Sequence, residues 1–218
     1  MQPGPWLVVI VTTAAQMVVA MANIVLPTIA PKVAESLGVD PVLVGYHVGL
    51  TFGAATFASV YAGIAVMRWG AALMTQLSMV FCVLGLALFA LPHVAFVALG
   101  SIAVGAGMGY ASPAAAQLLV RHTSPERRNL MFSIKQTGVP LGGVIVSLTA
   151  PALAVTLGWQ WALALIAALA VGTLIVTQRG RAPWDRDLQP AGSVRTEAFG
   201  GVPLVWRLET LRWVCLSA

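Results

Sequence analysis

The sequence predicts an all-α integral membrane protein, a bundle of six transmembrane helices followed by a cytoplasmic C-terminal tail. Of its 218 residues, 59% are hydrophobic and only 9% are charged, whereas soluble domains carry about 25% charged residues. The charges stand in short gaps between long apolar runs. These runs have the length that a helix needs to cross the ~30 Å hydrocarbon core of a bilayer.

Stretches without charge define the spans. Residues 1–31 and 41–67 are short enough for one span each. Residues 69–120 carry no charge either, and as one helix they would be roughly 78 Å long at ~1.5 Å per residue. We therefore expect them to fold back near Pro92. Residues 136–178 are again too long for one crossing. The six expected spans lie near residues 6–27, 42–66, 71–91, 94–118, 129–155 and 159–177.

The basic residues predict the orientation. Arg68 lies between spans two and three, Arg121, Arg127 and Arg128 lie between spans four and five, and six further arginines follow span six. With six spans, all of these share the side of the N-terminus, and the opposite side has only Lys32. Because basic loops stay in the cytoplasm, we expect a multi-pass protein of the cell inner or plasma membrane with both termini cytoplasmic.

Residues 179–218 are expected to lie outside this bundle. Residues 179–201 are polar and contain proline and glycine, which is typical of a linker. Residues 204–218 become apolar again and resemble the beginning of a seventh span. On this basis we expect the chain to be a truncated or fragmentary form of a longer protein.

Polar residues within the spans predict a central cavity, because such residues tend to face a bundle interior or a water-filled path. They concentrate in spans one, two, four and five, and spans three and six hold fewer. Gln16 and Asn23 share a face of span one, where they act either as hydrogen-bonding groups between helices or as substrate contacts. The candidate cavity residues are Gln16, Asn23, His47, Tyr110, Lys135 and Gln136.

His47 and Lys135 each allow two interpretations. His47, near the outer end of span two, is either an interfacial, hydrogen-bonded residue or a ligand or proton carrier. Lys135 lies about one turn inside the cytoplasmic boundary of span five, because residues 124–126 resemble a helix start. Either its long stem reaches back to the headgroups, or its ammonium group faces the cavity and attracts an anionic solute or closes an inner gate.

Glycines at intervals of four predict close helix packing, since small residues let helix backbones approach each other in lipid. Such stripes occur in span two (Gly45, Gly49, Gly53), span four (Gly105, Gly109) and span five (Gly138, Gly142). Span five also contains residues that weaken a helix beside Lys135. We therefore expect a hinge in span five, formed by Gly138, Pro140, Gly142 and Gly143.

Five segments together carry a resemblance to a known family. They are MANIVLPTIAPKVAESLGVDPVLVGYHVGLTFGAA (21–55), GIAVMRWGAAL (63–73), GAGMGYASPAAAQLL (105–119), SPERRNLMFSIKQTGVPLGG (124–143) and LETLRWVCLSA (208–218). In this order and spacing they resemble the N-terminal six-helix half of a transporter of the major facilitator superfamily (MFS). The loop signature of that family usually reads G-x-L-x-D-R-x-G-R-R, and Gly63, Arg68 and Gly70 match it as a gating motif.

This sequence also departs from the family pattern. Met67 replaces the loop aspartate, and Ser101 stands where many proton-driven members have an arginine. The resemblance therefore does not imply proton–drug antiport. No Asp or Glu lies inside a span. If transport is coupled to protons, the carboxylate must lie in a missing second half, or His47 must serve.

The resemblance implies transmembrane transport of a small solute, with an organic anion as one candidate, by alternating access between two six-helix halves. The expected partners are the lipid bilayer and a missing C-terminal half or a second half-transporter. The alternative is a membrane-embedded scaffold or subunit without transport activity of its own. We expect no enzyme, cofactor or metal site, because no His, Asp or Glu cluster suits such chemistry. The spans exclude a soluble nucleic-acid-binding protein.

Overall fold

The computed structural model describes residues 4–185, and the predicted seventh span lies outside this part. Six helical segments in the described part are long and apolar enough to cross a membrane, which confirms the predicted all-α membrane fold. They are α1 (Pro5–Thr28), α3 (Pro41–Trp69), α4 (Ala71–Phe89), α5 (Val94–His122), α6 (Arg128–Gln136) with α7 (Gly138–Thr156), and α8 (Trp159–Trp184).

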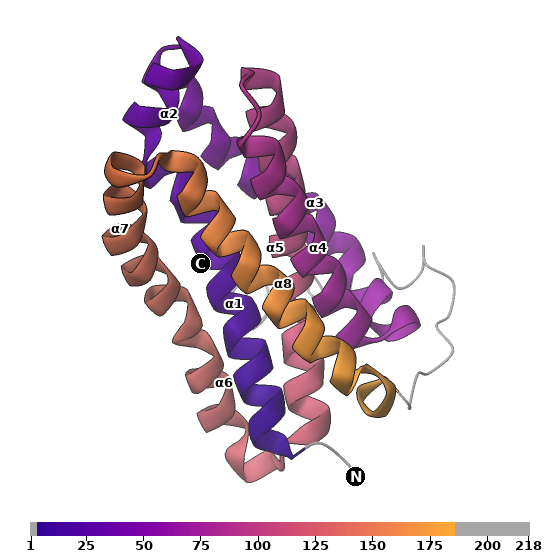
Figure 1. The fold of residues 1–218 in the computed structure, drawn as a ribbon. Helices are drawn as coiled ribbons and strands as arrows, with labels where there is room; N and C mark the ends of the chain where they lie inside the picture. Colours follow the sequence, from indigo (N-terminus) through magenta and orange to yellow (C-terminus); the bar gives the residue numbers. More distant parts are fainter. Residues whose placement is uncertain (1–3, 186–218) are drawn as a thin grey trace, which may run out of the picture.

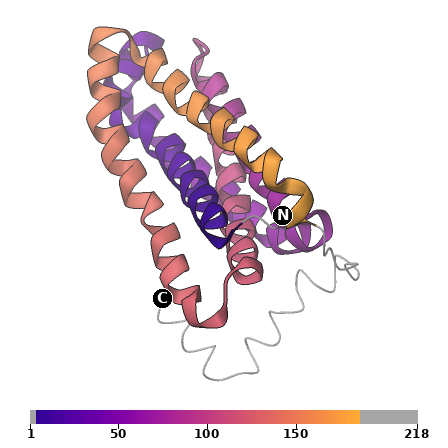
Figure 2. The ribbon, with the colours of Figure 1, turned by 60° about the horizontal axis from the view of Figure 1, so that its bottom comes forward.

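The helices form two groups around α1 (Figures 1 and 2). One group is α3, α4 and α5, in which α5 packs extensively against both neighbours. The other is the α6–α7 pair, which lies along the opposite side of α1. Helix α8 crosses obliquely over α1 and packs against α4 (Figure 1). As a result α1 is the most enclosed span. In its most apolar stretch of 18 residues 61% of the residues are buried, compared with 22% in the span formed by α6 and α7.

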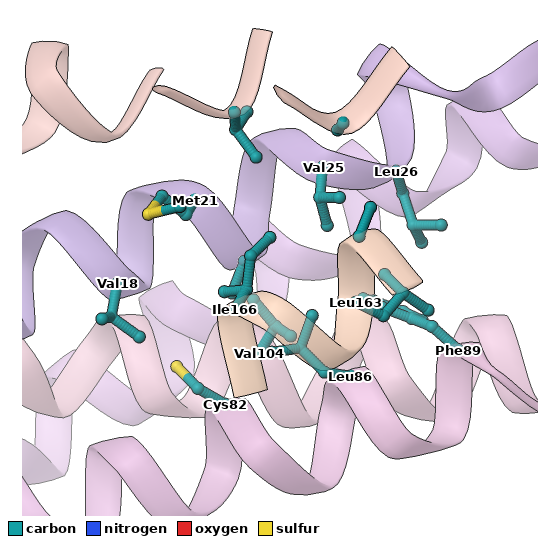
Figure 3. Packing of buried hydrophobic residues seen from close by; sticks show 14 of the residues in the cluster. Val18, Met21, Val25, Leu26, Cys82, Leu86, Phe89, Val104, Leu163 and Ile166 are labelled. Atoms are coloured by element: carbon teal, nitrogen blue, oxygen red, sulfur yellow. The ribbon is translucent and has the colours of Figure 1, made fainter. Parts of the chain in front are cut away.

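The apolar core lies where α1, α4, α5 and α8 meet (Figure 3). Met21 and Leu26 of α1, Leu86 of α4 and Ile166 of α8 are buried there together. A second cluster lies around Met74, Leu118 and other residues near the opposite ends of these helices. Both clusters are built mainly from Val, Leu, Met and Ala, whose side chains contain no polar group that needs a partner in lipid.

A short helix, α2 (Ala30–Leu37), occupies part of the connection between α1 and α3, where the sequence predicted only a loop. It buries Val33 and Ala34 against the core and exposes an ion pair between Lys32 and Glu35, with 3.1 Å between Nζ and Oε2. The helix forms because its apolar residues fall on one side and its charges on the other. It ends at Gly38, whose φ of +64° stops the helix.

Span five is interrupted at Thr137, which separates α6 from α7. Proline has no backbone N–H, so Pro140 cannot donate to the carbonyl of Gln136, the residue one turn earlier. Helix α6 ends at Gln136, where that hydrogen bond is missing. Thr137 remains close to helical geometry, with φ −62° and ψ −19°. The interruption is therefore a local weakness and not a sharp corner.

Helix α8 continues past its predicted end at residue 177 to Trp184. The first residues of the expected linker are therefore helical. Trp184 is 2% exposed and joins the cluster around Met74 and Leu118. Its ring lies over the backbone of Gly180, where a Cβ atom would be only 2.6 Å from the ring. Burial of this large aromatic surface explains why the helix extends beyond the apolar run.

The three glycine stripes have different roles. Added Cβ atoms on Gly138 and Gly142 would lie 2.6 Å from the carbonyl oxygens of Thr13 and Met17, and one on Gly109 would lie 2.7 Å from that of Ala55. The stripes of spans four and five thus let α5 approach α3 and α7 approach α1. The stripe of span two is open, because nothing in the described chain comes within 4 Å of a Cβ on Gly45, Gly49 or Gly53.

Candidate substrate cavity

Gln16 and Asn23 present unpaired oxygens from the central helix α1. Both side chains are half-buried. Their oxygens, Oε1 of Gln16 and Oδ1 of Asn23, are buried and find no hydrogen-bond donor among the described residues. Thr12, one turn from Gln16, is different, since its hydroxyl donates to the carbonyl of Val8 at 2.8 Å. Because an unpaired buried polar group costs free energy, Gln16 and Asn23 need a hydrogen-bond donor that is not among the described residues.

Lys135 lies on the side of α6 that faces α1. It shares this face with Gly138 and Gly142, which follow at intervals of three and four residues and contact the backbone of α1. The side chain is only 6% exposed. No acceptor for its ammonium group lies within hydrogen-bonding distance in the described part of the chain. Gln136, the next residue, is exposed.

His47 is buried at 1% exposure and joins three helices. Its Nε2 lies 3.0 Å from the backbone oxygen of Asn23 on α1, and its Nδ1 lies 2.8 Å from Oγ of Ser101 on α5. The ring makes a T-shaped contact with Phe89 of α4, with 5.3 Å between the centroids. His47 is therefore hydrogen-bonded, which is one of its two predicted interpretations. Its partner Ser101 was not a predicted site residue.

Tyr110 lies elsewhere. Its ring stacks on Phe81, with centroids 6.2 Å apart, and it lines a pocket of about 140 Å³ with Tyr61, Arg68 and Trp69. Tyr61 is 14 residues further along α3 than His47, a distance of roughly 21 Å along the helix axis. A small solute therefore cannot contact His47 and the pocket beside Tyr61 and Tyr110 at the same time. The six predicted cavity residues are therefore not all at one place.

The loop between α3 and α4 is held by a residue that the sequence did not point to. Gly70 ends α3 and begins α4 with a φ of +100°. Asp185 lies against it and accepts hydrogen bonds from the N–H groups of Ala72 (3.0 Å) and Leu73 (3.2 Å). Arg68 is exposed at the end of α3, and Gly63 faces open space. No local signal connects Asp185 with Gly70, because the two are far apart in the sequence.

The four predicted hinge residues divide into two pairs. Gly138 and Gly142 contact α1. Pro140 and Gly143 line an open groove of about 450 Å³ on α7, together with Val144, Ser147 and Leu148. A Cβ atom on Gly143 would make only an ordinary contact, 3.6 Å from Ile24. One side of span five therefore packs inside this bundle, and the other side is uncovered in the described part of the chain.

The sequence profile of the Major Facilitator Superfamily matches residues 10–218. The chain belongs to this superfamily. The match covers nearly the whole sequence, from within the first span through the sixth, so this MFS chain is a multi-pass membrane protein with a transporter fold.

Solved MFS structures share the fold. The proton:xylose symporter XylE bound to 6-bromo-6-deoxy-D-glucose aligns with a TM-score of 0.71 and 15% identity, over 80% of this chain and 44% of the symporter. A mutant of the peptide transporter POT in complex with alafosfalin aligns with a TM-score of 0.69 and 18% identity, over 100% and 48% of the two chains. This MFS chain thus spans less than half the length of these transporters. A comparison with curated proteins found no significant match.

Proposed function

We propose that this chain forms one half of a secondary transporter that moves a small anionic solute by alternating access. In such transporters two halves surround a site near the middle of the bilayer and rock around it. One six-helix half supplies a single wall of the site. The proposal therefore includes a second six-helix half, as a further part of the same chain or as a separate half-transporter.

The unpaired cation of Lys135 is the observation that carries the proposal. Lys135 is only 6% exposed, its side of α6 faces α1, and its ammonium group has no counter-charge in the described part of the chain. A lysine at the bilayer centre costs on the order of 3 kcal/mol, and less near a span end. The low exposure supports a cavity-facing group over one that extends to the headgroups. An anionic solute would supply the missing counter-charge, and its donor groups would satisfy Gln16 and Asn23.

The uncovered surfaces support a second half. The stripe of Gly45, Gly49 and Gly53 on α3 and the groove beside Pro140 on α7 belong to the two groups of helices on either side of α1. Both are apolar or small, and both would let another helix approach closely. A counterpart that touched both would close the cavity in front of α1.

We further propose that both chain termini face the cytoplasm of a cell inner membrane. The arginines support this, since Arg68, Arg121, Arg127 and Arg128 all lie at connections on one side of the bundle. Arg68 and Gly70 would then form part of a cytoplasmic gate, with Gly63 on the same helix facing the second half. The interruption at Thr137 would let α6 move relative to α7 when this gate opens.

Uptake into proteoliposomes by the complete transporter tests the role of Lys135. The probes are radiolabelled mono- and dicarboxylates that carry a hydroxyl or amino group as a hydrogen-bond donor, used as a panel of small organic anions. Lys135→Ala is expected to abolish uptake while expression is unchanged, because the counter-charge for the anion is lost. Lys32→Ala is the matched control, since Lys32 is exposed and paired with Glu35, and it should transport normally. Unchanged uptake by Lys135→Ala would remove Lys135 from the mechanism.

The six-helix chain alone is expected to be inactive in the same assay unless a second half is added. Uptake by the isolated monomer would contradict this part of the proposal. A membrane-embedded subunit without transport of its own is the second candidate, and the open glycine stripe of α3 favours it equally. Stable association with a partner, together with no thermal shift from any anion in the panel, would select the subunit.

A further inference from the structure

We propose that His47 is a proton-binding site, and that the bound proton completes the chain of hydrogen bonds that joins α1, α3 and α5. The contacts are those of His47 with the backbone oxygen of Asn23 and with the hydroxyl of Ser101. The number of hydrogens available to these short contacts points to the proton, independently of the proposed substrate and of Lys135.

Three short contacts form a chain across the junction. Nε2 of His47 lies 3.0 Å from the Asn23 carbonyl oxygen, Nδ1 lies 2.8 Å from Oγ of Ser101, and Oγ of Ser101 lies 2.6 Å from the Val97 carbonyl oxygen. Each contact needs one hydrogen between its two atoms. The two carbonyl oxygens can only accept. His47 and Ser101 must therefore supply all three hydrogens.

Neutral His47 cannot complete this chain. A neutral imidazole has one N–H, and Nε2 needs it, because the Asn23 oxygen accepts. Nδ1 then carries a lone pair. The single hydroxyl hydrogen of Ser101 can point to Nδ1 or to Val97, but not to both. Whichever it chooses, the other contact brings two acceptors together at 2.6 or 2.8 Å.

The other neutral tautomer and Thr51 do not remove the conflict. With the hydrogen on Nδ1, the lone pair of Nε2 faces the Asn23 oxygen at 3.0 Å. The Thr51 hydroxyl lies 3.3 Å from Nδ1 and could donate to it. Ser101 would still face Nδ1 at 2.8 Å without a hydrogen between the two atoms. Each neutral form therefore leaves one short contact unsatisfied.

Protonated His47 satisfies the three short contacts, and the Thr51 hydroxyl, 3.3 Å from Nδ1, then faces a donor and not an acceptor. Both ring nitrogens of an imidazolium are donors, so Nε2–H donates to Asn23 and Nδ1–H donates to Ser101. The Ser101 hydroxyl is then free to donate to Val97. Hydrogen bonds from a charged donor are shorter and about twice as strong as neutral ones, which agrees with the 2.8 Å between Nδ1 and Oγ of Ser101. The geometry therefore fits the cation.

No charged side chain of the described helices faces this cation. Helices α1 and α4 contain none, and those of α5 are at its far end. The charged or titratable groups near the outer end are engaged elsewhere: Lys32 pairs with Glu35, Asp40 accepts from Val42, and exposed His93 accepts from Ala95. A buried cation without a counter-charge is costly. The hydrogen bonds stabilise the protonated ring. The free-energy cost of burying its charge favours release of the proton.

Release of the proton removes the hydrogen from one of the three contacts. The contact that lengthens is the α1–α3 contact at Asn23, the α3–α5 contact at Ser101, or the contact between Ser101 and Val97 inside α5. Asn23 also carries the unpaired side-chain oxygen on α1. Where the Asn23 contact is the one that lengthens, proton occupancy at His47 is linked to the position of a cavity residue. Any coupling of this proton to solute movement rests on the proposed function, but the binding of the proton does not.

Nitrogen-15 NMR of histidine-labelled protein tests the proposal without measuring transport. The full chain, in lipid nanodiscs, carries His93→Asn and His122→Gln, so that His47 gives the only histidine signals. On titration from pH 9 to pH 5, both ring nitrogens are expected to become protonated. Ser101→Ala removes the acceptor of Nδ1–H and should move the midpoint to lower pH by about one unit. Ser112→Ala, at an exposed serine of the same helix, should leave it unchanged.

Two results would overturn the proposal. One is a His47 that stays neutral down to pH 5 in the chain with the natural Ser101. The other is an equal titration midpoint in Ser101→Ala and Ser112→Ala. The first measurement needs no substitution near His47, so it decides the question even if Ser101→Ala fails to fold. A neutral His47 would leave the transport proposal untouched, because that proposal depends on Lys135.

Discussion

Asp185 and Gly70 fit together so closely that a side chain on Gly70 would overlap the carboxylate of Asp185. Through this contact Asp185 reaches the first backbone N–H groups of α4, at Ala72 and Leu73. The first N–H groups of a helix have no partner within the helix, and a carboxylate at that end also interacts favourably with the helix dipole. The end of α8 thus serves as the cap of α4.

Gly70→Ala is expected to destabilise the protein by more than 1 kcal/mol, because alanine is strained at a φ of +100° and also collides with Asp185. Thermal unfolding in detergent measures the loss. Gly63→Ala is the matched control, since Gly63 lies inside α3 and faces open space. Its unfolding temperature should stay the same or rise slightly. Equal effects of the two substitutions would argue against the Asp185 contact.

Asp185→Ala should cost about 1 kcal/mol, the usual effect of removing a helix cap. Asp185→Asn keeps one acceptor oxygen and should cost less. The order natural, Asn, Ala is therefore expected in the midpoints of thermal unfolding. In Gly70→Ala, where the contact is already disturbed, the effect of Asp185→Ala should shrink. A fully additive double variant would show that the two residues act independently.

Gly142→Ala is expected to lower stability by about 2 kcal/mol, because its Cβ atom would lie 2.6 Å from the Met17 carbonyl and would force α7 away from α1. Gly49→Ala lies on the open stripe and should leave the unfolding of the isolated chain unchanged. It should instead weaken binding of a second half, measured by pull-down or by fluorescence transfer between labelled halves. Destabilisation by Gly49→Ala alone would contradict an open stripe.

Lys135→Met is expected to raise stability by about 1 kcal/mol, because it removes the charge from a largely buried side chain that has no partner in the described chain. Thiol-reactive dyes provide the measurement, since Cys82 is fully buried and reacts only on unfolding. The assay uses a Cys215→Ser background, so that Cys82 alone reports. Lys135→Arg keeps the charge and should bring no such gain. Loss of stability in Lys135→Met would point to a counter-charge outside residues 4–185.

Pro140→Ala should join α6 and α7 into one helix by restoring an N–H group that can donate to Gln136. The gain in helix stability is expected to be about 1 kcal/mol, part of the ~3 kcal/mol that proline costs inside a regular helix. Hydrogen exchange should then be slower for the amides around Thr137. If the interruption serves as a hinge, transport by the complete protein should slow as well. Unchanged exchange would mean that another residue interrupts the helix.

The spans could be predicted from the sequence because a helix that crosses lipid must be apolar over most of its length. A charge such as Arg68 or a turn residue such as Gly158 stands where a helix ends or begins in the described part of the chain. The exceptions have physical causes. Helix α2 is amphipathic and too short for a span, and α8 is extended by the burial of Trp184, which no hydropathy average reveals.

The site was less predictable, because periodicity shows which residues share a face but not what that face meets. Gly45 and Gly138 belong to similar stripes, yet one is open and the other contacts α1. His47 and Ser101 meet only because α3 and α5 pack at one particular register. Tyr110 was a reasonable choice by its polarity, but it lies beside Arg68. The contact of Asp185 with Gly70 follows from the fold alone.

The two occupied glycine stripes have a consequence for biogenesis. Each joins helices that leave the ribosome before the sixth span is complete: α3 with α5, then α1 with α7. These pairs of helices can therefore pack together early in the nascent chain. The open stripe formed by Gly45, Gly49 and Gly53 remains without a neighbour in the described chain. Under the proposed function, a second half would therefore dock onto a six-helix unit that has already folded, and the helices of the two halves would not need to fold together.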